Sequence, residues 1–202
     1  MGTVTVKIYP EPELERAEIL RYIGVKSPTD ELRALIEESI DEALPGISYK
    51  VCYAEFPIKQ SGACIDLGFT ETSSRSLRRV LSGCDSVVLF AATLGVGADR
   101  LIMRYSGRNR AKALALDGLF TERIEALCDA FCREVAKEKS KDGFEITDRF
   151  SAGYGDFPLE VQRDIFTHLL PQKNIGVCLN SSLLMTPTKS VTAVIGIKKR
   201  NG

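Results

Sequence analysis

The segment Ser86–Thr93, with the sequence SVVLFAAT, restricts the fold of this chain more than any other. Between its two ends every residue is apolar, without the polar alternation of a strand that has one face in water. The segment is therefore expected to be a strand that other parts of the chain cover on both sides. The 202 residues are enough to build one substantial core around it.

The charge composition excludes several classes of function. The chain has 27 basic and 27 acidic residues, and this balance removes the usual electrostatic argument for binding nucleic acid or an anionic membrane. No apolar run reaches membrane-spanning length. Residues 1–10 alternate as in a strand and lack the layout of a signal peptide, so we expect a cytoplasmic protein.

The cysteine and histidine residues argue against a metal site and against hydrolase chemistry. Cys128 and Cys132 share a helical face, but a metal needs further ligands and His168 is the only histidine. With one histidine, at helical spacing among apolar residues, neither a Ser-His nor a Cys-His hydrolase is expected. The sequence predicts no catalytic residue and no metal. The six cysteines are scattered without a CxxC pair and are expected to be reduced thiols.

Hydrophobic periodicity predicts an α+β fold. A capped start at Ser27 is expected for the second helix. The order of hairpin-like strands and helices predicts a single domain over residues 1–202, in which helices flank a twisted, mainly antiparallel sheet. The expected strands are 3–9, 47–56, 65–69, 86–93, 175–184 and 191–197. The expected helices are 11–23, 27–44, a short one around residue 77, 111–139 and one after residue 158, with a charged turn at 137–143.

Two groups of charged residues each have two interpretations. Arg75, Arg78 and Arg79 lie on the outer side of the short helix, where they form either a solvated face or a surface for an acidic partner. Glu122, Glu125 and Asp129 lie three and four residues apart on one side of the longest helix, in either a solvated acidic face or a site where one carboxylate meets a cationic ligand. Both interpretations stay open at this point.

One motif concentrates small residues, aromatics and a fixed cation ahead of a helix: RFSAGYGDFPLEVQ, from Arg149 to Gln162. Two glycines flank Tyr154, which suits a backbone that turns sharply or lets another molecule approach. Arg149 offers a planar fork for a carboxylate or phosphate. Asp156 and Pro158 suit the start of the following helix, as a cap and a first-turn residue. The alternative interpretation is a surface turn that leads into a helix.

Together with MTPTKSVTAVIGI, which begins at Met185, this motif resembles the activation (reactivation) domain of cobalamin-dependent methionine synthase. Further similar segments are LRYIG around Tyr22, DSVVLFAATLG from Asp85 and IEALCDAF in the long helix. The resemblance spans nearly the whole chain, and the two late motifs occur in the right order and spacing. In the long enzyme this domain is the C-terminal module, so the resemblance implies a stand-alone subunit whose catalytic modules lie on another polypeptide.

The resemblance also implies a function. The family domain binds S-adenosylmethionine and docks over the cobalamin module, where a flavodoxin-type donor reduces cob(II)alamin and the product is methylated. Its contribution is proximity and orientation rather than acid–base chemistry. This implies a reactivation subunit of that methyltransferase, with cobalamin carried by the partner. A non-catalytic docking module for a corrinoid protein, or a reactivator of another corrinoid methyltransferase, is the alternative.

Roles for individual residues follow from the same resemblance. Arg149 would hold the ligand near its carboxylate, and Tyr154 would pack on the ligand or face its sulfonium. Glu125 would pair with the ammonium or sulfonium charge, and Asp129 would replace it if the helix alignment slips by one turn. The implied S-adenosylmethionine-binding residues are Arg149, Ala152, Gly153, Tyr154 and Glu125, and the implied docking residues are Asp156 and Pro158.

Three features depart from the family pattern. Gly24 stands where the family has an aspartate after a Tyr-Ile pair. The longer members continue past the last strand and supply another tyrosine, whereas this sequence ends at Gly202. The second half of the motif, GDFPLEVQ, lacks the Cys and His of the long enzymes. From these differences we expect weaker ligand binding, or a site that a partner completes.

Overall fold

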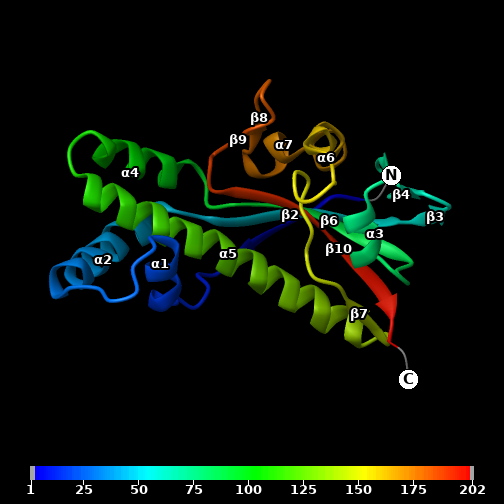
Figure 1. Cartoon of the computed structure of the whole chain (residues 1–202), viewed down its shortest axis with the longest axis horizontal. Helices are drawn as coiled ribbons and strands as arrows, with labels where there is room; N and C mark the ends of the chain where they lie inside the picture. Colours follow the sequence, from blue (N-terminus) through cyan, green and yellow to red (C-terminus); the bar gives the residue numbers. More distant parts are fainter. Residues whose placement is uncertain (1–2, 201–202) are drawn as a thin grey trace.

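A curled, five-stranded antiparallel sheet forms the centre of the molecule (Figure 1). The computed structural model describes residues 3–200. In the strand order β1-β2-β6-β10-β7, each strand runs antiparallel to its neighbours. The strands are β1 (Thr5–Tyr9), β2 (Tyr49–Pro57), β6 (Ser86–Thr93), β10 (Ser190–Lys199) and β7 (Phe144–Ile146).

The central strand, β6, is covered on both sides, as its apolar sequence predicts. Its register places Phe90 opposite Tyr53 of β2 on one side and Ala193 of β10 on the other. Successive side chains of a strand point to opposite faces. Phe90 therefore contributes to one core and Leu89 to the other, and both are completely buried.

One core lies between the sheet and four helices. The long helix α5 crosses this face, and three other helices pack around its N-terminal half (Figure 1). Phe120, Ile124 and Phe131 of α5 are buried against the sheet. The helices are α1 (Arg16–Tyr22), α2 (Asp30–Ala43), α4 (Val96–Ser106) and α5 (Arg110–Ser140), and a 3₁₀ turn, η1 (Leu44–Gly46), follows α2.

The second core lies against the opposite face of the sheet. Three short helices cover it together with a small three-stranded sheet, and a short hairpin projects beside them (Figure 1). The helices are α3 (Arg75–Val80), α6 (Gln162–Leu169) and α7 (Pro171–Ile175), with a 3₁₀ turn, η2 (Leu159–Val161), before α6. The small sheet comprises β3 (Lys59–Ser61), β4 (Cys64–Asp66) and β5 (Glu71–Thr72), and the hairpin comprises β8 (Cys178–Leu179) and β9 (Met185–Thr186).

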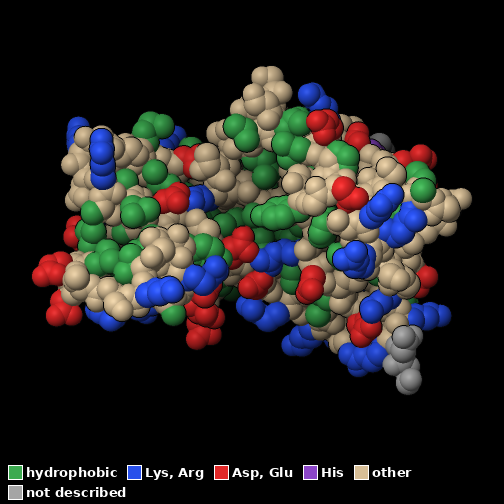
Figure 2. All heavy atoms as spheres, viewed as in Figure 1, with side chains coloured by type: hydrophobic (Ala, Val, Ile, Leu, Met, Phe, Trp, Pro, Cys, Tyr) green, Lys and Arg blue, Asp and Glu red, His purple; other side chains and the backbone are tan. Residues whose placement is uncertain are grey.

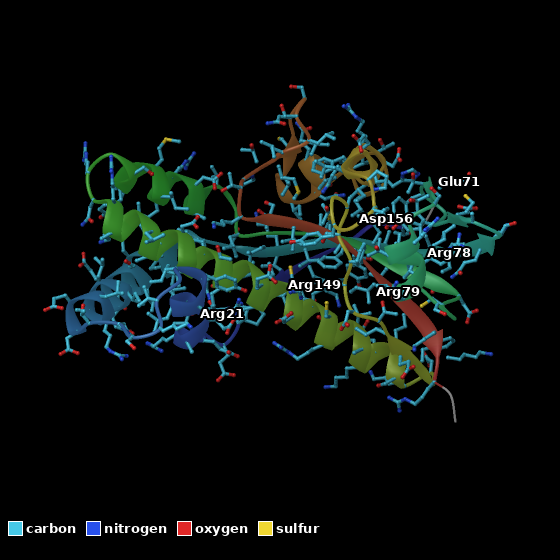
Figure 3. The ribbon with its side chains drawn as sticks, viewed as in Figure 1. Arg21, Glu71, Arg78, Arg79, Arg149 and Asp156 are labelled. Atoms are coloured by element: carbon cyan, nitrogen blue, oxygen red, sulfur yellow. The ribbon has the colours of Figure 1, made fainter. Side chains whose placement is uncertain are left out.

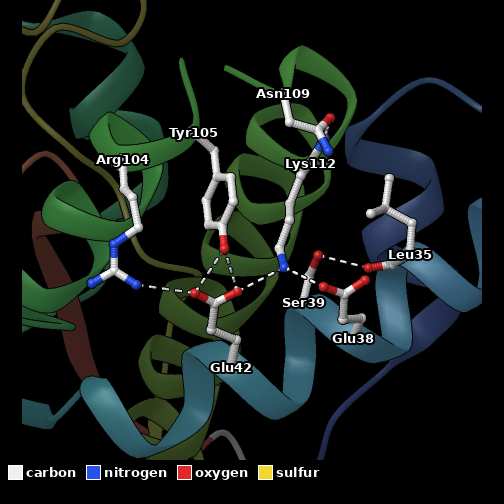
Figure 4. Close-up of polar contacts among 8 residues, drawn as sticks. All are labelled: Leu35, Glu38, Ser39, Glu42, Arg104, Tyr105, Asn109 and Lys112. Carbon is white, nitrogen blue, oxygen red and sulfur yellow. Dashed lines mark hydrogen bonds and ion pairs between the residues drawn. The ribbon is translucent and has the colours of Figure 1, made fainter. Parts of the chain in front are cut away.

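A buried lysine fastens α2, α4 and the start of α5 to one another (Figure 4). The Lys112 side chain is 5% exposed, and its ammonium nitrogen lies 2.7 Å from carboxylate oxygens of both Glu38 and Glu42. Glu42 also accepts a hydrogen bond from the Tyr105 hydroxyl at 2.9 Å and pairs with Arg104 at 3.1 Å. Because a buried charge needs such partners, the cluster fixes the relative placement of these three helices.

Three predicted helix boundaries are wrong, and the first is the start of the helix expected at 11–23, which begins only at Arg16. Thr29 rather than Ser27 caps α2, because its hydroxyl oxygen accepts a hydrogen bond from the Leu32 amide at 3.3 Å. Helix α5 continues to Ser140, so most of the predicted charged turn at 137–143 is helical. The lysines and the glutamate of this segment have high helix propensity, and their charge does not end a helix that is already packed.

The predicted strand at 175–184 is also wrong over most of its length. Gly176, in left-handed backbone conformation (φ 78°), ends α7. The side-chain oxygen of Asn180 then accepts hydrogen bonds from the amides of Ser182 and Leu184 at 2.9 and 3.0 Å. These two turns leave only β8 extended, because local glycine and asparagine chemistry outweighs the apolar pattern.

No helix within residues 3–200 is long and apolar enough to cross a membrane. Over the same described part of the chain, no group of three or more His, Cys, Asp and Glu side chains is placed to hold a metal ion. The six cysteines are all free thiols.

Candidate functional site

The side chain of Arg149 reaches α5 from the extended segment that follows β7 (Figure 3). Its guanidinium contacts the carboxylates of Glu125 and Asp129, which lie one turn apart on α5. The adjoining backbone is held in place because Phe150 exchanges two hydrogen bonds of 2.9 Å with Val194 of β10. The fold thus brings the predicted cation together with both candidate anions.

The Arg149 cluster is only partly buried. The side chains are 26% exposed for Arg149, 37% for Glu125 and 53% for Asp129. Burial disfavours the charged guanidinium, but the hydrogen bond to Asp129 and the charge of Glu125 outweigh it, and the pKa of Arg149 is raised. Arg149 is therefore a permanent cation whose two partners still face water.

Arg149 and Glu125 form the wall between two hollows, and both residues line each of them. The acidic hollow has a volume of about 650 Å³ and lies on the α1 side of α5. The apolar hollow has a volume of about 580 Å³ and lies between the motif, β10 and the β8–β9 hairpin. Residues that line only the acidic hollow include Glu15, Glu18, Tyr22, Asp129 and Arg133, and those that line only the apolar hollow include Tyr154, Leu159, Leu184, Met185 and Thr188.

The apolar hollow contains most of the predicted ligand-binding residues. Those that line it are Arg149, Ala152, Tyr154 and Glu125. Gly153 is next to them and has a φ of +91°, a conformation that other residues rarely adopt. A Cβ atom at this position would lie 3.2 Å from the Leu159 side chain. Gly153 thus shapes the hollow through its backbone, although it does not line it.

A tight loop presents Tyr154 at the mouth of the apolar hollow. The amide of Gly153 donates to the Phe157 carbonyl at 2.8 Å, and the amide of Phe157 donates to the Tyr154 carbonyl at 3.0 Å. Phe157 is 2% exposed and anchors the loop in the second core, whereas Tyr154 is 69% exposed. The loop therefore combines a fixed backbone with an accessible aromatic ring.

Asp156 fastens this loop to α3 (Figure 3). Its carboxylate accepts hydrogen bonds from the Ser74 hydroxyl at 2.6 Å and from the amides of Arg75 and Ser76 at 2.7 and 3.0 Å. These donors, led by the Ser74 hydroxyl, hold the pKa of Asp156 well below its usual range. The prediction that Asp156 caps the helix after the motif is wrong, because it caps α3, about 80 residues earlier in the chain.

The predicted docking residues are both exposed. The carboxylate of Asp156 is engaged within the chain by the α3 cap, whereas Pro158 leads into η2 as its N-terminal flanking residue. Their role in docking stays a prediction.

Sequence reasoning missed the wall of the apolar hollow that residues 183–192 provide. Thr188 in this wall is anchored because its amide donates to a carboxylate oxygen of Asp99, in α4, at 2.9 Å. Lys189 follows and pairs with Asp117 of α5 at 2.7 Å. The motif MTPTKSVTAVIGI was the available signal, since it marks this segment without assigning a role to any residue.

Gly24, where the family pattern has an aspartate, lines neither hollow. Tyr22 and Glu18, up to two turns earlier, line the acidic hollow. The N-terminal part of the chain therefore contributes a tyrosine ring and carboxylates near Arg149 from other positions.

A scan against protein-family models finds no match, and a search of curated proteins finds none either. Among solved structures, a match is the crystal structure of the MetH reactivation domain bound to AdoHcy. The TM-score is 0.67 at 15% sequence identity, and the match covers 100% of this chain and 80% of that chain. The chain has the fold of the MetH reactivation domain.

The MetH reactivation domain fold confirms the predicted α+β class, with a mainly antiparallel sheet and flanking helices. It also confirms the resemblance that the two late motifs indicate, at the level of the fold. At 15% identity the match carries no residue roles, so these depend on the geometry of Arg149 and its two hollows.

Proposed function

We propose that this chain binds S-adenosylmethionine in the apolar hollow and serves as the reactivation module of a cobalamin-dependent methionine synthase. The observation that carries the proposal is the meeting of Arg149, Tyr154 and Glu125 in one hollow of a chain with this fold. The AdoHcy bound in the MetH reactivation domain supports a ligand of the same chemical class. The cobalamin-binding modules and a flavodoxin-type electron donor would be separate chains.

The charges at the hollow match those of S-adenosylmethionine, which carries a carboxylate, an ammonium and a sulfonium. Within the chain, Arg149 contacts Glu125 and Asp129. Binding is then an exchange of partners, in which the ligand carboxylate takes the guanidinium and the ligand ammonium takes Glu125. Because the ligand brings both signs of charge, no group at the wall is left without a partner.

The rest of the apolar hollow suits the nucleoside part of the ligand. Its volume of about 580 Å³ lies in the range of small-molecule sites. Leu159 and Met185 offer apolar surface for a purine ring, and the Thr188 hydroxyl, which donates its proton to Asp99 at 2.5 Å, can accept a hydrogen bond from the ligand. Tyr154, exposed at the mouth, is available for a cation–π contact with the sulfonium.

The contribution of the chain is orientation. When bound, S-adenosylmethionine supplies an activated methyl group, which the cobalamin of the partner accepts in this function. Arg149 and Glu125 hold the amino-acid end of the ligand, while Ala152 and Gly153 let the backbone lie close to it. Fixing a reacting group in this way is worth several kcal/mol in a bimolecular transfer, up to about 7–11 kcal/mol in well-oriented cases.

A second function is a non-catalytic module that docks on a corrinoid protein without using S-adenosylmethionine. One observation favours it: Arg149 already has two carboxylate partners within the chain. A guanidinium with this arrangement needs no ligand to satisfy its charge.

Titration calorimetry with S-adenosylmethionine separates the two functions. We expect the wild-type chain to bind the ligand and Arg149→Ala to bind about 10- to 100-fold more weakly, the range for a lost charge-assisted hydrogen bond. Arg133→Ala is the matched control, because Arg133 lines only the acidic hollow. Absence of binding heat, with and without the cobalamin module, would contradict the first function and leave the docking module.

A further inference from the structure

The arginine face of α3, formed by Arg75, Arg78 and Arg79, carries positive charge that the chain does not neutralise. Within residues 3–200 none of the three guanidinium groups takes part in an ion pair. Arg75 and Arg79 are exposed. Figure 2 shows blue side chains gathered over the end of the molecule where Figure 1 places α3. In a chain of balanced charge, this face is locally basic.

Arg78 adds a second, independent observation. Its Nε atom is buried and has no hydrogen-bond partner in the described part of the chain. Buried polar donors are nearly always hydrogen-bonded, and within the described residues the chain supplies no acceptor to this atom. Arg78 as a whole is only half-buried, so its outer nitrogens can still be reached from outside. A carboxylate from another molecule can therefore pair with these outer nitrogens, which lie at the surface beside the buried Nε atom.

The arginine face is continuous with the mouth of the apolar hollow. Asp156 caps α3 from the motif loop, and a Cβ atom at Gly155 would lie 2.8 Å from the Ser76 hydroxyl oxygen, so loop and helix are closely packed. Next to this contact, Tyr154 is 69% exposed and Leu159 38% exposed. Leu184, on the opposite wall of the hollow, is 62% exposed.

We propose that the arginine face is the basic rim of a docking surface whose apolar centre is the mouth of the hollow. The occupant is the protein that covers the hollow, and it presents carboxylates to Arg75, Arg78 and Arg79. This inference rests on the proposed function, because it assumes a protein partner at the hollow. An apolar, aromatic centre surrounded by arginine is the usual composition of such interfaces.

A protein fits this surface better than a nucleic acid does. Nucleic-acid binding normally uses a long basic stripe on a basic domain, whereas this chain has a net charge of zero and three arginines on one short helix. A carboxylate matches the planar fork of a guanidinium with two parallel hydrogen bonds. Charge complementarity therefore indicates that the partner is a protein with acidic residues facing the arginines.

The test uses the double variant Arg78→Glu/Arg79→Glu of the full chain. The probe is the cobalamin-binding module of the methionine synthase from the same organism. The matched control is Arg108→Glu/Arg110→Glu, two exposed arginines at the α4–α5 corner, far from α3 (Figure 1). We expect module binding to weaken about tenfold or more in the test variant, and its salt dependence to flatten. The control is expected to stay within about twofold of wild type.

Titration with S-adenosylmethionine alone separates this inference from the proposed function. Intact ligand binding with unchanged module binding in the test variant overturns the basic rim and leaves the proposed function standing. Failure of the wild type to bind either probe overturns both. If the wild type and the control bind a single-stranded oligonucleotide and the test variant does not, the arginines bind nucleic acid, and the inference is wrong. Arg79→Glu alone, at an exposed position, replaces the double variant if circular dichroism shows that the latter is unfolded.

Discussion

Two clusters of arginine and carboxylate side chains lie on the same helix, α5. They contain the same kinds of charged group but differ in their exposure to water. In the first, Arg123 pairs with Glu122, and the two side chains are 0% and 4% exposed. In the second, Arg149 meets Glu125 and Asp129 with all three side chains open to water. The clusters lie less than two turns apart along α5.

The buried cluster is completed within the chain. The guanidinium of Arg123 donates to the carbonyls of Pro12 and Glu13 at 2.7 and 2.6 Å as well as to Glu122. Glu122 in turn accepts the amide of Glu15 at 3.0 Å. The pair thereby ties the segment before α1 to α5, and its polar atoms are engaged by these contacts within the chain.

The open cluster has partners that can be exchanged. Arg149 holds only carboxylates, and one of them, Glu125, lines both hollows. The exposure of an arginine–carboxylate pair, and the number of backbone groups that it hydrogen-bonds, therefore indicate whether its role is structural or ligand-binding. Residue type alone does not separate the two roles.

Breaking the buried cluster should produce the largest effect. Glu122→Gln leaves Arg123 charged and poorly paired in the core, and we expect a loss of about 3–5 kcal/mol in the free energy of unfolding. Glu125→Gln should cost less than about 1 kcal/mol, because exposed ion pairs contribute little. Urea unfolding followed by circular dichroism measures both. Equal losses in the two variants would show that the clusters do not differ in structural role.

The open cluster should respond in ligand affinity instead. Glu125 lines both hollows and Asp129 only the acidic one, so the two carboxylates make a matched pair. Glu125→Gln is expected to weaken S-adenosylmethionine about tenfold by removing the partner of the ammonium. Asp129→Asn should leave affinity within about twofold, or raise it slightly, since it frees Arg149 for the ligand carboxylate. Titration calorimetry that reversed this order would place the ligand in the acidic hollow.

Asp156 shows that an exposed carboxylate can have a structural role. Its side chain is exposed, yet it accepts hydrogen bonds from three donors within the chain. The Ser74 hydroxyl and then the amides of Arg75 and Ser76 depress its pKa in the folded state. A depressed pKa stabilises the fold above the unfolded value of about 3.9, and this contribution is lost as the pH falls through the folded value. Asp156→Asn should therefore lower the thermal midpoint at pH 7 and narrow the gap to wild type below about pH 4.

Thermal melts across this range measure the effect, with Asp142→Asn as the control at an exposed turn position. A gap of constant size at every pH would mean that the shape of the side chain rather than its charge holds α3 to the motif loop.

Four of the five strands of the central sheet and the long helix could be predicted from the sequence because their signals are local, whereas the three-residue strand β7 was not expected. The apolar run of β6 and the stripe of Phe120, Ile124 and Phe131 record burial directly in the residue pattern. The helix expected at 11–23 begins only at Arg16, because the carbonyls of Pro12 and Glu13 accept hydrogen bonds from Arg123. A contact across more than 100 residues leaves no trace in local periodicity.

The candidate site likewise has a part that the sequence predicts and a part that depends on tertiary packing. Arg149 and Tyr154 belong to one continuous motif, so their proximity could be predicted. The double role of Glu125, as partner of Arg149 and as wall of two hollows, depends on how α5 packs beside the motif. Asp156 has the residue type of a helix cap, but the helix it caps is chosen by tertiary packing.

The smallest predicted effect concerns backbone strain at two leucines, one in the wall of the apolar hollow and one outside it. Leu183 in the hollow wall and Leu170 outside both hollows have left-handed backbone, with φ of 63° and 47°. Asparagine tolerates this conformation better than leucine, so Leu170→Asn should gain about 0.5–1 kcal/mol in the free energy of unfolding. Leu183→Asn should gain a similar amount but weaken S-adenosylmethionine a few-fold, since it removes apolar wall. If both variants bind the ligand like wild type, the hairpin plays no part in the site and the strain at Leu183 is a property of the turn alone.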